Sequence, residues 1–402
     1  MSKIPNGNLD DLVRFTQDLS KPIIFPSTSD SPISMNATDK KLRHLLQQLT
    51  LGHAVKPANL LEERKAFLHP RFSHEKKSPA FKYKNAHSNW TDFKPILPLE
   101  SMDAPDEVVE IYREKQLELD RTKNMFAAVG SEKFTQFAIE LFGAPTAEDA
   151  RQARRVLEKF SNVIPPERNC SAEDFSKLLE ARLEKFGISM DIKLVSSMAT
   201  KISVDSVSHL IHLNRNALFA SQEVKRLLVH EIDVHAVRIH NGSCLPWGIF
   251  SMGTAGYREA EEGLAVHFER RSDHLYPFQE KIYAGRCLAV YLSLTAGFAE
   301  VFEELLVYFD EQTAYTIVER VKRGLADTSR SGALTKEFHY FTGPNRVRSY
   351  LHGKGSLKML MGGKIAFKHA KLIDRFVQNG LVDSSNWIFP VEMNDDKESV
   401  PA

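Results

Sequence analysis

The sequence predicts an α+β fold that is mostly helical, with a small sheet directly before one apolar helix. Apolar residues at helical spacing predict helices at 107–128, 132–142, 146–160, 171–186 and 221–241, then across 258–323 and at 366–379. Short runs in which apolar and polar residues alternate predict strands at 188–194, 202–204 and 210–213. With 402 residues, 42% of them hydrophobic, the chain is long enough to bury a large core.

The first quarter of the chain divides into two predicted parts that precede the main domain. Residues 1–37 are rich in Ser, Pro and Asn, which predicts a flexible leader. Residues 38–105 are expected to form an extended arm that packs on the core and contains a short helix at 39–49. The main domain is then expected to span 106–390, followed by a flexible tail at 391–402.

Within this arm, the stretch 53–98 interleaves basic and aromatic residues. The basic residues are Arg71, Lys76, Lys77, Lys82 and Lys84, and the aromatic residues are Phe72, Phe81, Tyr83, Trp90 and Phe93. Such a mixture is able to bind single-stranded nucleic acid or an acidic peptide. We favour the interpretation in which the aromatic rings pack on the domain while the lysines stay solvated.

Composition narrows the class of protein. A net charge of +1 gives no general attraction to nucleic acid or membrane, so neither is an expected partner. Three cysteines without a CxxC pair predict neither a disulfide framework nor a thiolate metal site. The first residues lack an apolar signal segment, and no apolar run is long enough to cross a membrane. A cytoplasmic location is expected, although export by a specialised secretion machine leaves no such trace.

The helix at 221–241 is the most informative element. Ser221 is the expected N-cap, and Asn241-Gly242 the expected C-cap. Its apolar face is formed by Val224, Leu227, Leu228, Ile232, Val234 and Val237. Because such a helix is buried, a histidine or glutamate on it must be paired or bound to a metal.

This helix contains His230-Glu231-Ile232-Asp233-Val234-His235. Two imidazoles beside a glutamate suit Zn²⁺, but the zinc-peptidase motif His-Glu-x-x-His spaces its histidines by four. At a spacing of five, a regular helix places the rings roughly 140° apart. A one-residue π-bulge between His230 and His235 would bring the rings together. Two alternatives are that His230 and Glu231 are hydrogen-bonded core residues, or that Glu231 and His235 are the ligands.

A second acidic helix follows at 261–269. In the gluzincin arrangement, a glutamate from such a helix completes a site of two histidines and one glutamate, here Glu262. Gly263 would let the two helices approach closely. The alternative is that acidic residues at a helix start simply interact favourably with the helix dipole.

Together these segments resemble a known family, the zinc carboxypeptidases related to the microtubule-associated enzyme that removes the C-terminal tyrosine of α-tubulin. Bacterial relatives share a Gln/Glu-Glu-Gly-Leu-Ala-Val motif. The resemblance rests on the five-spaced histidines, Arg238, Pro246-Trp247, Glu261-Glu262-Gly263-Leu264-Ala265, Lys322-Arg323-Gly324, Asp327-Thr328-Ser329, Lys336 and Tyr340-Phe341-Thr342-Gly343. It implies a gluzincin-like metallopeptidase domain with one zinc per chain held by His230, His235 and Glu262. Glu231 would be the catalytic base.

A carboxypeptidase also needs a cation for the terminal carboxylate of its substrate. Arg323 is the first candidate because it lies in a motif of the family, beside Gly324 and before Asp327-Thr328-Ser329. Thr328 of this motif is a further candidate for binding substrate, and Arg238 and Arg330 are weaker candidates for the cation. The alternative for Arg323 is an ordinary salt bridge at a helix end. Tyr340 is a candidate donor to the tetrahedral oxyanion or else a buried structural tyrosine.

Three further residues, Asp233, His240 and His267, are candidates for orienting a ligand imidazole. The predicted function is a zinc-dependent carboxypeptidase acting on a protein or peptide tail, with tubulin as substrate if the chain acts in a eukaryotic cell. The alternatives are a zinc endopeptidase or amidase, and a zinc-binding regulator without activity. The presence of Glu231 disfavours a regulator, because a structural zinc site needs no base.

Overall fold

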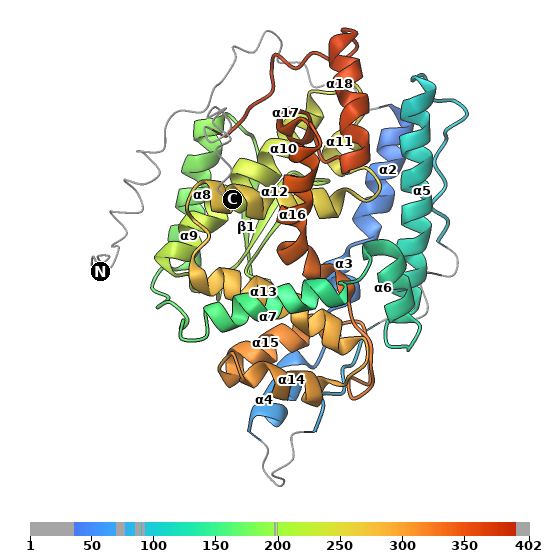
Figure 1. The fold of residues 1–402 in the computed structure, drawn as a ribbon. Helices are drawn as coiled ribbons and strands as arrows, with labels where there is room; N and C mark the ends of the chain where they lie inside the picture. Colours follow the sequence, from blue (N-terminus) through green and yellow to red (C-terminus); the bar gives the residue numbers. More distant parts are fainter. Residues whose placement is uncertain are drawn as a thin grey trace. The chain divides into compact units, whose positions relative to one another are not determined.

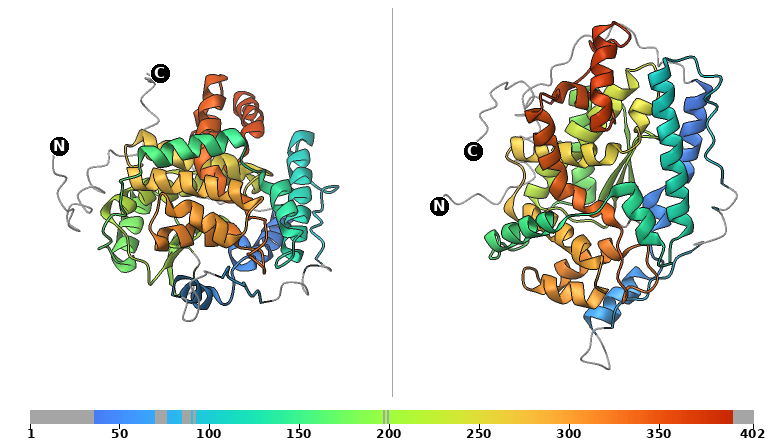
Figure 2. Two further views of the ribbon diagram at one scale, coloured as in Figure 1. Left: turned by 60° about the horizontal axis from the view of Figure 1, so that its bottom comes forward. Right: turned by 45° about the vertical axis from the view of Figure 1, so that its right-hand side comes forward.

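A computed structural model describes residues 36–69, 77–84, 90, 93–196, 198 and 200–390. The predicted leader and tail lie almost wholly outside these residues. Contacts divide the chain into two compact units, the first comprising 1–40, 165–276 and 347–402, and the second 41–164 and 277–346. The boundary falls inside two helices, α2 (Ala37–Gln48) and α16 (His339–His352). Figures 1 and 2 show the elements.

The first unit contains the sheet and a long helical run. Its elements are α8 (Ala172–Phe186), β1 (Asp191–Val195), β2 (Ile202–Asp205), β3 (Leu210–Asn214), α9 (Ser221–Leu227), the π-helix η1 (Leu228–Ala236), α10 (Val237–Ser243), α11 (Ile249–Met252), α12 (Tyr257–Arg271), α17 (Leu357–Met361), the 3₁₀ helix η3 (Phe367–His369) and α18 (Ala370–Gln378). Strand β3 is central, parallel to β1 and antiparallel to β2. Its buried Ile211 and Leu213 share one face, as the strand period of two requires.

The second unit is helical. It contains α3 (Leu51–Ala54), α4 (Leu60–Leu68), α5 (Asp106–Ala127), α6 (Phe134–Phe142), α7 (Ala147–Lys159), α13 (Pro277–Ser293), α14 (Phe298–Leu306), α15 (Glu311–Lys322) and the 3₁₀ helix η2 (Thr335–Phe338). Helix α13 packs against both α7 and α15, and the left view of Figure 2 shows it between them. Part of the core is aromatic, with the ring of Phe67 lying 5.0 Å from that of Phe298 and 4.9 Å from that of Phe302. The prediction of a mostly helical α+β chain with a small sheet is therefore confirmed.

The described part of the arm packs as we favoured. Phe81 is buried, and its backbone N–H donates to the carbonyl of Ala326. The ring of Trp90 lies 5.2 Å from that of Phe126. The described basic residues Lys77, Lys82 and Lys84 are exposed, whereas Arg71, Phe72 and Lys76 lie outside the described residues. These contacts belong to the second unit and indicate a structural role for the aromatic rings.

Two predicted caps of the helix at 221–241 are wrong. The N-cap is Ala220, whose N–H is 3.5 Å from Glu223 Oε2, and Ser221 is the first helical residue. At the other end the helix continues to Ser243, so Gly242 is not a cap. A Cβ at Gly242 would overlap the carbonyl oxygen of Phe250, so glycine is required there for close packing.

Among the described residues, no helix is both long enough and apolar enough to cross a membrane.

Candidate metal centre

The backbone between the two histidines is a π-helix, Leu228–Ala236, lying between α9 and α10. A π-helical turn closes with an i→i+5 hydrogen bond, so residues five apart lie one above the other on one face. The rings of His230 and His235 accordingly lie 4.7 Å apart, nearly perpendicular to each other. The predicted irregularity is confirmed, and the helix is not regular as one alternative required. The π-helix is buried along its whole length.

Helix α12 brings Glu262 to the same place. Its Oε2 lies 3.4 Å from His230 Nε2, and ligand atoms of His230, His235 and Glu262 all lie within 4.8 Å of one another. Two ligand atoms that hold one zinc ion at ~2.0–2.1 Å in tetrahedral geometry are about 3.4 Å apart. Two imidazoles and one carboxylate, which leave a fourth position open, are a donor set of zinc hydrolases. The three residues therefore fit a zinc ion.

A buried carboxylate stands behind His230. Glu269, which has no exposed surface, lies 2.6 Å from His230 Nδ1 and accepts a hydrogen bond of 2.7 Å from Arg226. Burial alone would raise the pKa of Glu269, but Arg226 and His230 hold it below its ordinary value. Similarly, burial would lower the pKa of His230, but Glu262 and Glu269 raise it to about 10. A carboxylate at Nδ1 fixes the ring so that Nε2 faces Glu262.

A second buried carboxylate stands behind His235. Glu261 Oε1 lies 3.0 Å from His235 Nδ1 and accepts a hydrogen bond of 2.7 Å from Lys364. The other oxygen of Glu261 accepts from Arg238, which has no exposed surface. Burial opposes ionisation, but Lys364, Arg238 and His235 hold the pKa of Glu261 well below its ordinary value. Each candidate imidazole ligand thus has an ionised glutamate at its second nitrogen.

Arg238 thus holds Glu261, the carboxylate that lies beside His235. It also donates to the carbonyls of Leu360 and Ile365, at 3.2 and 2.9 Å. The guanidinium is therefore enclosed by three acceptors and does not meet solvent. A role of Arg238 toward a substrate remains a prediction.

Glu231 differs from the other glutamates here. It lies on the π-helix between the two histidines and is buried. No hydrogen bond or ion pair engages its carboxylate within the part of the chain that the structure describes. Glu261 and Glu269 each accept a hydrogen bond from an arginine, whereas the carboxylate of Glu231 does not.

The residues that back the imidazoles were not predicted. Asp233 instead pairs with Arg182 (2.8 Å), and His240 lies against Cys244 at 4.0 Å. Burial and three nearby arginines lower the pKa of His267 to about 4. One sequence pattern does point to Glu269, because Glu262 and Glu269 are seven residues apart and so share one face of α12.

The other candidate residues belong to the second unit. Arg323 donates to Glu319 Oε1 from Nε at 3.2 Å and from Nη2 at 2.5 Å, which is the salt bridge we weighed as its alternative. The buried hydroxyl of Thr328 donates to the carbonyl of Pro79. Tyr340 stacks on Tyr283 at 5.3 Å. Arg330 is exposed and pairs with Asp327 at 3.3 Å. Any role of these four residues toward a substrate remains a prediction.

The candidate ligands are two histidines and one carboxylate, a donor set that is able to hold a metal ion. The family model described as microtubule-associated tyrosine carboxypeptidase matches residues 65–400. The chain therefore belongs to this family.

Individual relatives agree with this assignment. The chain is 23% identical over 342 residues to microtubule-associated tyrosine carboxypeptidase 1 of Mus musculus, and 24% identical over 342 residues to that of Rattus norvegicus. Each match covers 83% of this chain and 63% of the relative. The protein of the same name from Homo sapiens is 26% identical over 168 residues, or 40% of this chain and 34% of its own length. The chain thus spans less than two thirds of the relatives it matches.

Proposed function

We propose that this chain is a zinc-dependent peptide hydrolase that removes a C-terminal residue from a protein or peptide tail. The observation that carries the proposal is the convergence of His230, His235 and Glu262 beside Glu231, whose carboxylate is not engaged by the described residues. Sheet, histidine helix and glutamate helix follow one another in the order expected of a gluzincin-like domain. The family name adds the exopeptidase character.

Each residue of the site has a separate role in the proposed reaction. His230, His235 and Glu262 would hold the ion, and Glu269 and Glu261 would keep the two imidazoles oriented. Zinc, when bound, supplies a Lewis acid that polarises a carbonyl and acidifies water. Glu231 would take a proton from the attacking water and deliver it to the leaving amine. A protein that only stored zinc would not need an unengaged carboxylate at this position.

The substrate class follows from the family. The relatives are named tyrosine carboxypeptidases and microtubule-associated, so we propose a protein tail that ends in tyrosine, such as that of α-tubulin, as the first substrate to test. A library of peptides that vary at the last residue, read by mass spectrometry, identifies the residue removed. Amidated peptides belong in the same library, since cleavage of an amidated peptide at the native rate would favour an endopeptidase.

The test of the centre itself combines metal analysis with hydrolysis. Purified protein should contain close to one zinc per chain, and His235→Ala or Glu262→Ala should lose it. Zinc retained in Glu262→Ala would move the third ligand to Glu261 or His267. Glu231→Gln should retain zinc while hydrolysis falls by at least about 100-fold, because glutamine is not a base. Glu180→Gln, an exposed position on α8, is the matched control. Loss of zinc in Glu231→Gln would instead make Glu231 a ligand.

A further inference from the structure

The second unit contains a cluster of cations gathered around one carboxylate. Glu337, on η2, is buried and receives two hydrogen bonds of 3.0 Å from Arg320 of α15. Lys336 donates to the same carboxylate at 2.8 Å. Arg286 of α13 approaches it to only 3.7 Å, which is too long for a hydrogen bond.

The charges of this cluster do not balance. Burial alone would raise the pKa of Glu337, but Arg320, Lys336 and Arg286 hold it well below its ordinary value, so it carries one negative charge. Three cations share this one carboxylate, and the further carboxylate that acts on Arg320, that of Glu319, is bound to Arg323. Arg320, Arg286 and Lys336 keep 15, 16 and 23% of their side-chain surface exposed, so an anion from solution can reach them.

Arg286 is the least satisfied member. Its guanidinium makes no hydrogen bond to any described residue, and its Nε is fully buried. It lies instead over two stacked rings, 5.1 Å from the centre of Tyr340 and 5.8 Å from that of Tyr283. The rings hold the cation by cation–π attraction but leave its N–H donors unused. A planar fork of unused donors matches a carboxylate, which accepts two parallel hydrogen bonds.

We propose that Arg286, with Arg320 and Lys336 beside it, forms a carboxylate-binding site whose ligand is the C-terminal carboxylate of a peptide. The identity of the ligand rests on the proposed function, while the existence of the anion site rests on the cluster itself. Tyr340 then serves as the platform that positions Arg286.

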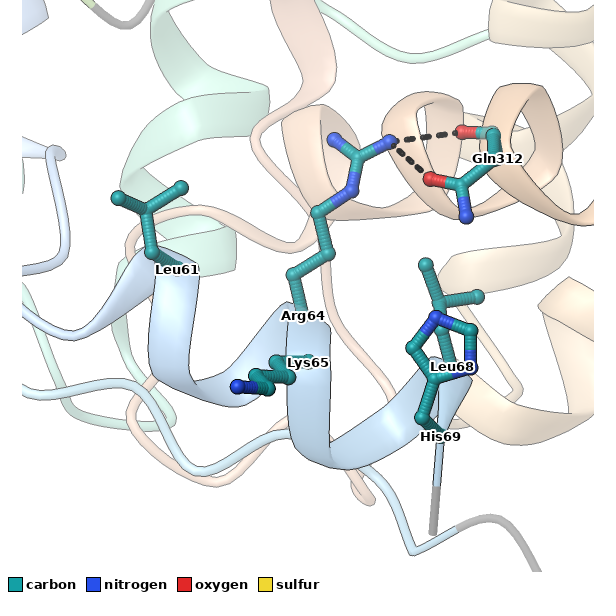
Figure 3. Close-up of a pocket in the computed structure, with 6 residues that line it drawn as sticks. All are labelled: Leu61, Arg64, Lys65, Leu68, His69 and Gln312. Carbon is teal, nitrogen blue, oxygen red and sulfur yellow. Dashed lines mark hydrogen bonds between the residues drawn. The ribbon is translucent and has the colours of Figure 1, made fainter.

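Three other arginines lack the features that distinguish Arg286. Arg323 is bound to Glu319, and Arg238 is fully enclosed by acceptors. Arg64 also lies over a tyrosine, 5.2 Å from the ring of Tyr315. However, it donates to the side chain and the carbonyl of Gln312, at 2.9 and 3.3 Å. Figure 3 shows these bonds at the edge of a depression of about 230 Å³. Arg64 is therefore a matched control.

Binding without hydrolysis tests the proposal. The full chain with Glu231→Gln is titrated with a fluorescent peptide that ends in tyrosine, as the free acid and as the amide, by anisotropy. The free acid should bind at least about tenfold more tightly, since hydrogen bonds between charged groups are stronger than neutral ones. Arg286→Gln should reduce the preference for the acid to near unity, and Arg64→Gln should keep it. Equal binding of acid and amide, or a preference that survives Arg286→Gln, overturns the proposal.

Two further measurements keep the outcomes distinct. If Arg286→Gln fails to fold, as thermal unfolding would show, Lys336→Gln takes its place and should reduce the preference about threefold or more. Inorganic phosphate and acetate are compared as competitors, and displacement by phosphate alone would reject a carboxylate as the ligand. An acid preference that depends on Arg286 in a protein without peptidase activity would support this site while refuting the proposed function.

Discussion

Glu269→Gln tests whether the carboxylate behind His230 supports the metal centre. The substitution keeps shape and an acceptor oxygen but removes the charge that faces His230 Nδ1 at 2.6 Å. Partners of this kind contribute about 10–100-fold to metal affinity, or ~1.4–2.7 kcal/mol. The same change removes the carboxylate that pairs with Arg226, whose side chain is only 7% exposed. Breaking a buried pair from one side costs roughly 3–5 kcal/mol of folding stability.

The two effects are separable by a second substitution. Glu269→Gln with Arg226→Met removes both charges, so most of the stability should return while zinc affinity stays low. Affinity is measured by competition with a chromophoric chelator, and stability by urea unfolding. Zinc affinity equal to that of the native protein in both variants would refute the role of Glu269. Recovery of affinity together with stability in the double variant would mean that the loss reflected unfolding alone.

Two other predictions concern folding. Burial lowers the pKa of Lys322 to about 7, although its ammonium donates to the carbonyls of Ala296 and Arg330 at 2.6 and 2.9 Å. The unfolded chain therefore binds this proton more tightly, and the native state gains stability as the pH rises from about 7 towards 10, by at most ~1.4 kcal/mol per pH unit. Lys322→Met should remove that slope in urea unfolding at pH 7.5 and 9.5, and equal slopes would contradict the shift. Gly242→Ala should destabilise the protein by about 1–3 kcal/mol, because its Cβ meets the carbonyl of Phe250. Gly52→Ala, with open space around it, should not lower the melting temperature.

Local patterns predicted the elements well where the signals lie within a few residues. The helix expected at 107–128 runs over Asp106–Ala127, and the one expected at 171–186 over Ala172–Phe186. Ser171 accepts a hydrogen bond from Asp174 N and so fixes the start of the second helix. The five-residue spacing of the histidines also predicted a distortion of the helix, because no regular helix makes both rings face one ion.

The ion pairs around the site could not be predicted from local sequence patterns. Glu261 binds Lys364, which is 103 residues away, and Asp233 binds Arg182, which is 51 residues away. Buried ion pairs of this kind depend on how distant segments fold together, and periodicity carries no information about their partners. The partner of Thr328 was likewise not predictable: its buried hydroxyl donates to the carbonyl of Pro79, which is 249 residues away in the sequence.

The π-helix also determines how the following helix, α10, is rotated about the helix axis. One extra residue in a helix turns the next segment by about 100° relative to an uninterrupted α-helix. Arg238 lies just after the π-helix, in α10, and reaches Glu261 from that rotated position. Deleting one residue between the histidines would give the common four-residue spacing but would turn Arg238 away from Glu261. The spacing of the ligands and the ion pair behind them are therefore coupled, and a shorter motif would require a different partner for Glu261.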